Sequence, residues 1–194
     1  MPKRSKRASM KCLDTSSVCD EQKWFAAEDM WPSIRSFCKA WDGARDLGTV
    51  SVFDRSCRVS RTFNKSGEAT AAYDIEHDQG MDIVSESGFF LLLGLLLRLM
   101  PNSFSMWAPP CSLFIFFTSS LHERHRCGPW GNLDHYVVRL ANRISINCAV
   151  ALKVALKFRS DCRAMVEQPA GSWLFKSPIW IEIIAGFYLN RTLT

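Results

Sequence analysis

The chain has 194 residues, of which 47% are hydrophobic, enough for one domain with a substantial core. Its formal net charge is +5. Because the first eleven residues hold five basic side chains and no acid, they account for the whole excess. The remainder of the chain is neutral, which argues against a domain whose entire surface binds long nucleic acid.

The N-terminal segment is the most basic part of the sequence. We expect residues 1–20 to form a disordered tail and residues 21–194 to form a single domain, with a truncated C-terminus as a further hypothesis. Lys3, Arg4, Lys6 and Arg7 would suit a contact with nucleic-acid phosphates or a nuclear address. The alternative for this tail is a solvated segment without a partner.

Apolar and β-branched runs alternate along the rest of the chain. Residues 21–41 are rich in tryptophan and indicate helical or irregular packing. The patterns then predict, in chain order, a strand at 49–53, a weak helix at 55–66, a strand at 69–75, a helix at 88–100, a strand at 104–107, a helix at 133–158 and a strand at 163–169. This order predicts an α/β fold, a Rossmann-like, mostly parallel sheet with helices on both faces.

The segment "GFFLLLGLLLRLM" at 88–100 is the most apolar in the chain. A membrane-spanning helix needs about 20 apolar residues, and this segment is shorter and contains Arg98. We therefore expect a core helix and no membrane partner.

The cysteines are scattered through the chain and none belongs to a Cys-x-x-Cys pair. This usage is typical of reduced thiols in an intracellular protein. The cluster "HERHRC" offers His122, His125 and Cys127, but a structural zinc site normally has a fourth ligand. We expect a polar loop there and no metal site.

The predicted strand ends carry the residues that suit chemistry, since parallel sheets bind ligands beyond the carboxyl ends of their strands. Asp74 closes the second strand, and Asp82 follows shortly afterwards in "GMDI". An acid after the second strand suits the ribose hydroxyls of a nucleoside-bearing cofactor. The alternative is that each aspartate bonds its own backbone in a turn.

The complete set of strand-end motifs resembles the cytosine-5 DNA methyltransferases, a family of the S-adenosylmethionine-dependent, Rossmann-like class. The resemblance extends over 49–171. The matching positions are Phe53, Asp74, Asp82 in "GMDI", Pro110-Cys111 and Glu167 in "VEQP". It implies that S-adenosylmethionine is the cofactor and that it contacts Phe53, Asp74, Ile75, Asp82 and Pro110.

The resemblance also implies a covalent mechanism on cytosine. Cys111 would add as a thiolate to C6 of an extruded base, while Glu167 stabilises the charge that develops near N3. The diproline before Cys111 would fix the nucleophile loop, and Arg124 or Arg126 would be the cation that favours the thiolate.

Three residues depart from the family pattern and support an alternative. Arg55 stands where the family has a glycine that lets the backbone approach the cofactor, and it would crowd the methionine part of that cofactor. Gln168 replaces an asparagine, and Pro169 removes a donor. The alternative is a non-catalytic α/β interaction or nucleic-acid-associated module that has lost cofactor binding, in which Cys111 is an inert turn thiol.

Overall fold

A parallel β-sheet forms the centre of the molecule in the computed structural model, which describes residues 26–191; the expected tail at 1–20 therefore lies outside the described residues. The strands are β1 (Leu47–Val52), β2 (Thr70–Tyr73), β3 (Leu99–Trp107) and β4 (Arg163–Val166). They lie in the order β2-β1-β3-β4 and every neighbouring pair is parallel. The predicted α/β class is confirmed.

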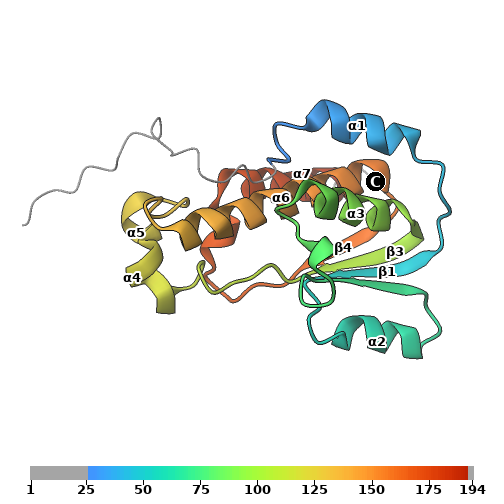
Figure 1. Cartoon of the computed structure of the whole chain (residues 1–194), viewed down its shortest axis with the longest axis horizontal. Coiled ribbons are helices and arrows are strands. Elements are labelled where there is room, and N and C mark those ends of the chain that lie inside the picture. The colour runs from blue at the N-terminus through green and yellow to red at the C-terminus, as the bar shows by residue number, and fades with distance from the viewer. Residues whose placement is uncertain (1–25, 192–194) are drawn as a thin grey trace, which may run out of the picture.

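Helices cover both faces of the sheet, as expected (Figure 1). On one face lies α2 (Arg58–Lys65), which connects β1 to β2. On the other lie α1 (Trp31–Ala40), α3 (Glu86–Leu97), α6 (Tyr136–Phe158) and α7 (Pro178–Arg191) (Figure 1). Since right-handed crossovers are strongly preferred, a reversal in the direction of strand addition moves the connecting helix to the opposite face.

The boundary between α3 and β3 differs from the predicted one, which had a helix up to residue 100 and a strand from residue 104. The helix ends at Leu97 and β3 already begins at Leu99, because Arg98 turns the chain and pairs with Asp46 through two hydrogen bonds of 2.8 and 2.7 Å. A shift in the β1–β3 register then accommodates Pro101 inside the strand.

The core lies between the sheet and the helices α3 and α6. Val50, Val52 and Trp107 project from the sheet into it, and the apolar side of α3 is buried against them. Tyr73 is also buried, and its hydroxyl donates to the carbonyl of Gly88 at 3.0 Å. The Leu-rich segment is therefore a core helix, and no helix within residues 26–191 is long and apolar enough to cross a membrane.

The "HERHRC" segment is not a polar loop, which corrects that expectation. It contributes to two short helices, α4 (Ser119–His122) and α5 (Arg124–Cys127), and both His122 and Arg124 are fully buried. Three single-turn 3₁₀ helices complete the described part: η2 (Gln79–Met81), η3 (Phe116–Thr118) and η4 (Trp173–Lys176).

Candidate functional site

The strand order reverses between β1 and β3, so the crevice that binds ligands in sheets of this kind lies beyond their carboxyl ends. β2 and β4 form opposite edges of the sheet. At about 4.8 Å per strand, their ends are roughly 14 Å apart. The sequence-predicted residues accordingly form two groups, with Phe53 and Asp74 on one half of this edge and Cys111 and Glu167 on the other.

The loop between β1 and α2 is held by a buried carboxylate. Asp54 accepts hydrogen bonds from the backbone N–H and the hydroxyl of Ser60, both at 2.9 Å, and thereby caps the first turn of α2. Phe53 precedes it in the left-handed region at φ 66°. Arg55 is 76% exposed and lies 3.5 Å from the carboxylate of Glu76, so it bridges the loops after β1 and β2.

The two predicted cofactor acids both bond their own turns. Asp74 is buried, and its Oδ1 accepts from the backbone N–H of Glu76 at 2.9 Å. Asp82 accepts from the N–H of Val84 at 3.1 Å through Oδ1. This is the local role that the alternative predicted, and it uses one oxygen of each carboxylate. Ile75, beside Asp74, exposes half of its side chain.

Asp82 lies close to the core beneath α3. Burial raises the pKa of Tyr73 above its ordinary range, and electrostatic interactions with Cys148 and with Asp82 raise it further. The tyrosine is therefore a neutral hydrogen-bond donor to the first turn of α3 throughout the physiological pH range.

On the other half of the edge, the diproline corner after β3 is attached to the loop after β4. The amide Nε2 of Gln168 donates to the carbonyl of Pro109 at 2.6 Å, and the N–H of Glu167 donates to the carbonyl of Trp107 at 2.8 Å. The Gln168 Oε1 in turn accepts from Ser172 at 3.0 Å. Cys111 is half-buried and Glu167 is exposed, on neighbouring loops.

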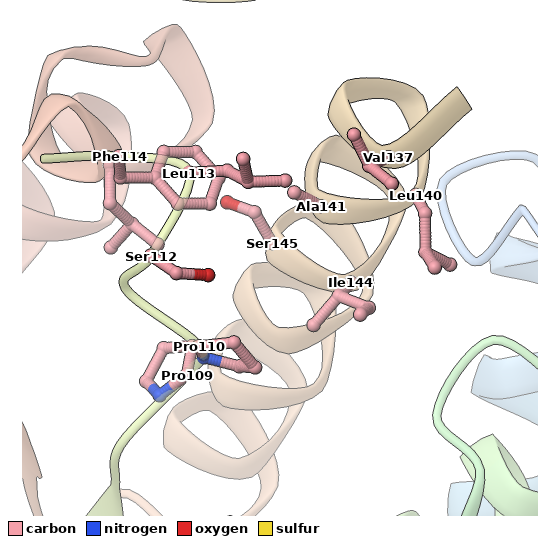
Figure 2. Close-up of a pocket in the computed structure, with 11 residues that line it drawn as sticks. Pro109, Pro110, Ser112, Leu113, Phe114, Val137, Leu140, Ala141, Ile144 and Ser145 are labelled. Atoms are coloured by element: carbon pink, nitrogen blue, oxygen red, sulfur yellow. The ribbon is translucent and has the colours of Figure 1, made fainter. Parts of the chain in front are cut away.

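A cavity of about 190 Å³ lies between this corner and α6 (Figure 2). Pro109, Pro110 and Phe114 form one wall, and Leu140 and Ile144 of α6 form the other. The lining is mainly apolar, with the hydroxyls of Ser112 and Ser145 as its polar groups; the latter accepts from Trp180 Nε1 at 2.9 Å. Cys111 is not among the lining residues.

Arg124 fixes the segment that follows Cys111. Its Nε donates to the carbonyl of Leu113 at 2.8 Å, a second nitrogen donates to the carbonyl of Pro129, and the third donates to Asn142 Oδ1 at 2.9 Å. The guanidinium also lies 4.2 Å from the centre of the Phe114 ring. Burial lowers the pKa of Arg124 to about 10, so it stays charged at neutral pH.

These contacts give both candidate cations other partners than the thiol of Cys111. The three donor groups of Arg124 are directed at carbonyls and an amide, and Arg126 lies 3.6 Å from the carboxylate of Glu123. Arg124 thus acts on the shape of the corner, since it anchors the backbone next to the cavity.

The structure also brings together a pair that sequence reasoning missed. Cys57, at the start of α2, has its sulfur 3.2 Å from Nε2 of His77, which belongs to the turn after β2. No local motif joins them. The available signal was that each residue follows one of two strands that become neighbours in the sheet.

Comparisons of the chain with protein-family models, with curated proteins and with solved structures find no match. Within residues 26–191 no group of three or more histidine, cysteine, aspartate or glutamate side chains is placed to hold a metal ion. The geometry of the carboxyl edge is therefore the basis for assigning a function.

Proposed function

We propose that the chain is a diverged S-adenosylmethionine-dependent methyltransferase-like domain that binds its cofactor at the carboxyl edge of the sheet. The observation that carries this proposal is the position of Asp74, in the turn after β2, the strand next to β1 on whose other side the strand order reverses. An acid in this place accepts hydrogen bonds from ribose hydroxyls in dinucleotide-binding folds.

The surroundings of Asp74 fit a nucleoside. Its Oδ1 is held by the N–H of Glu76, which fixes the carboxylate. The exposed side chain of Ile75 offers an apolar surface for an adenine ring. Arg55 extends toward Glu76, and this outward position reduces the crowding that an arginine at a glycine position would otherwise cause.

The chemistry proposed for this site is methyl transfer to cytosine in nucleic acid. The cofactor supplies an electrophilic methyl group when bound. Cys111 would add to C6 of the base, so that C5 takes the methyl group, and loss of the C5 proton would then break the bond from sulfur to C6 and release Cys111. Glu167 on the neighbouring loop would hold a proton near N3. The hydrogen bond from Gln168 Nε2 to the carbonyl of Pro109, at 2.6 Å, supports this role. It connects the loop after β4 to the loop after β3 and so limits the movement of one relative to the other.

The first test is calorimetric titration of the full chain with S-adenosylmethionine. Asp74→Asn should weaken binding tenfold or more, because the neutral amide is a poorer acceptor for ribose hydroxyls. Asp78→Asn is the matched control, since Asp78 also bonds its own turn, to Gly80 at 2.6 Å, but lies on the exposed surface. No binding at millimolar cofactor would refute the proposal.

The second test concerns the nucleophile. Cys111→Ser should abolish transfer of a radiolabelled methyl group to cytosine-containing nucleic acid and leave cofactor affinity within about twofold, because a serine hydroxyl is a much weaker nucleophile than a thiolate. Retained transfer would refute the role of Cys111.

A non-catalytic interaction module is the second candidate function. Phe116 and Phe117 are 82% and 92% exposed, and adjacent exposed aromatic rings are typical of protein-interaction surfaces. This candidate predicts that the chain does not bind S-adenosylmethionine, so the titration separates the two. The tail residues Lys3, Arg4, Lys6 and Arg7 remain the proposed nucleic-acid contact under either function, with a nuclear location as a further hypothesis.

A further inference from the structure

Cys57 and His77 meet at the carboxyl edge of the sheet and take no part in the proposed methyl transfer. Cys57 follows β1 and His77 follows β2. The sulfur lies 3.2 Å from His77 Nε2, and the same nitrogen lies 3.0 Å from the carbonyl oxygen of Asp54.

The carbonyl of Asp54 determines which tautomer of His77 is present. A carbonyl oxygen only accepts hydrogen bonds, so Nε2 must carry the proton in this arrangement. The one Nε2 proton is therefore shared between the Asp54 carbonyl oxygen and the sulfur of Cys57. A sulfur that accepts this hydrogen bond is held in place beside the imidazole.

The backbone at Cys57 is also unusual. Cys57 is the N-cap of α2 and adopts φ 52°, the left-handed region that favours glycine or asparagine. A cysteine is strained there, by roughly 1 kcal/mol, so backbone preference does not explain its presence. The positive end of the helix dipole adds a favourable interaction with a negatively charged sulfur.

Three other cysteines of the described residues have environments that oppose ionisation. Burial raises the pKa of Cys38 to about 11 and raises the pKa values of Cys148 and Cys162 as well. Cys57 is instead half-exposed and therefore accessible to small reagents in solution.

We propose that Cys57 and His77 form a reactive thiol–imidazole pair that is oxidised by small hydroperoxides. The Cys57 thiolate attacks one peroxide oxygen, so that a sulfur–oxygen bond forms and the oxygen–oxygen bond breaks. The second oxygen leaves as hydroxide or alkoxide and is protonated from solvent. Sulfur loses two electrons to the peroxide and becomes a sulfenic acid. His77 is a positioning residue, because its imidazole holds the sulfur of Cys57 at 3.2 Å.

The test is oxidation of the full chain by hydrogen peroxide with a dimedone trap, read for each cysteine by peptide mass spectrometry. We expect Cys57 to be labelled at least tenfold faster than Cys162, which is also half-buried and has no role in the proposed methyl transfer. His77→Leu should slow labelling of Cys57 about tenfold and leave the rate at Cys162 unchanged. His77→Gln, which keeps an N–H donor, should restore part of the rate.

His125→Leu is the matched control, because His125 is an exposed histidine on α5 and should leave Cys57 labelling unchanged. Equal labelling of Cys57 and Cys162 in the wild-type chain, or an unaltered Cys57 rate in His77→Leu, would overturn the proposal. The wild-type ratio needs no variant, so it stands even if His77→Leu folds poorly. All reactions omit S-adenosylmethionine, and their outcome is therefore independent of the proposed function.

Discussion

The guanidinium of Arg124 donates to the carbonyls of Leu113 and Pro129 and to the side chain of Asn142. Arg124→Met would keep the apolar stem near Phe114 but leave the buried amide oxygen of Asn142 and the two part-buried carbonyls without their donor. At about 1–3 kcal/mol for an unsatisfied buried group, we expect the free energy of unfolding to fall by roughly 3 kcal/mol or more. Urea denaturation followed by circular dichroism measures this change.

The control for Arg124 is Arg126→Met in the same short helix. Arg126 is mainly exposed, and its ion pair with Glu123 is of the i,i+3 surface type. Its loss should cost less than about 0.5 kcal/mol. Equal effects of the two substitutions would contradict the anchoring role of Arg124.

His122 gives stability a pH dependence of known sign. Its Nε2 donates to the carbonyl of Ile115 at 2.9 Å, and its Nδ1 accepts from the N–H of Arg124 at 3.0 Å, so the neutral ring satisfies both partners. Burial lowers the pKa of His122, against a smaller raising effect of the Ile115 bond, and the charges of Arg124 and His125 lower it further.

A histidine with a lowered folded-state pKa binds its proton more readily in the unfolded chain. The contribution of His122 to stability is therefore complete above the usual histidine pKa of about 6.5. It declines as pH falls below that value, until the lower folded-state pKa is reached. Thermal melts from pH 7.5 to 5 should show a smaller loss in His122→Gln than in the wild type; parallel curves would contradict this assignment.

The sequence located the strand-end residues but not the buried pair His122 and Arg124. Asp74 and Cys111 could be placed because apolar runs mark the strands that precede them. In "HERHRC" the side chains are polar, and their burial depends on backbone carbonyls and on Asn142, which no residue pattern encodes. The contact between Cys57 and His77 was hidden for the same reason, since it exists only once β1 and β2 pair.

Among the helices, α3 depends on a glycine in its first turn. A Cβ added to Gly88 would lie 2.1 Å from the carbonyl oxygen of Asp82, so Gly88→Ala must displace either the helix or the Asp82 turn. We expect a loss of about 1–3 kcal/mol, the usual cost of overpacking. Urea denaturation measures it, and cofactor titration would report the displacement of Asp82.

Gly94 is the matched control on the same helix. An added Cβ there meets only the Trp41 ring, at 3.6 and 3.7 Å, an ordinary contact. Gly94→Ala should be neutral or stabilise the protein by up to about 1 kcal/mol through helix propensity. If both alanine variants lose the same stability, close approach at Gly88 is not the cause.

The predicted strands and the predicted helices α3 and α6 were confirmed as elements, whereas the polar loop predicted at 122–127 and the boundary between α3 and β3 were wrong. The long apolar stripe of α6 repeats at helical spacing, and its observed range, Tyr136–Phe158, lies within the predicted one. At the α3–β3 junction the apolar run continues from helix into strand without a break in composition. The turn at Arg98 is fixed by Asp46, a residue that is distant in sequence.

For the whole molecule, charge is concentrated in one segment. Replacing Lys3, Arg4, Lys6, Arg7 and Lys11 by glutamine removes the whole net charge of +5. If the tail binds duplex DNA, the slope of log K against log salt should fall in magnitude by up to about 0.9 for each phosphate that the replaced side chains neutralise. Fluorescence anisotropy over a salt series measures the slope.

The control variant carries Lys39→Gln and Lys65→Gln, two exposed lysines on the body of the domain. It should leave the slope nearly unchanged. A tail variant that keeps the full wild-type slope would contradict the assignment of nucleic-acid binding to this segment.

The α/β class was predictable because strands and helices alternate along the chain. The strand order was not, since local patterns do not say on which side of β1 each later strand adds. That order places β2 and β4 at opposite edges. It therefore places Asp74 and Glu167, both predicted at strand ends, on opposite halves of the carboxyl edge.

All neighbouring strands in the described part of the chain are parallel. None of these pairings can therefore form as a local β-hairpin. Each pairing requires a complete crossover connection, which makes folding slow relative to proteins built from local contacts. During synthesis, β1, β2 and β3 can assemble once Trp107 has left the ribosome. One side of β3 then stays unpaired until Val166 follows, and this interval is when the nascent chain is most exposed to aggregation.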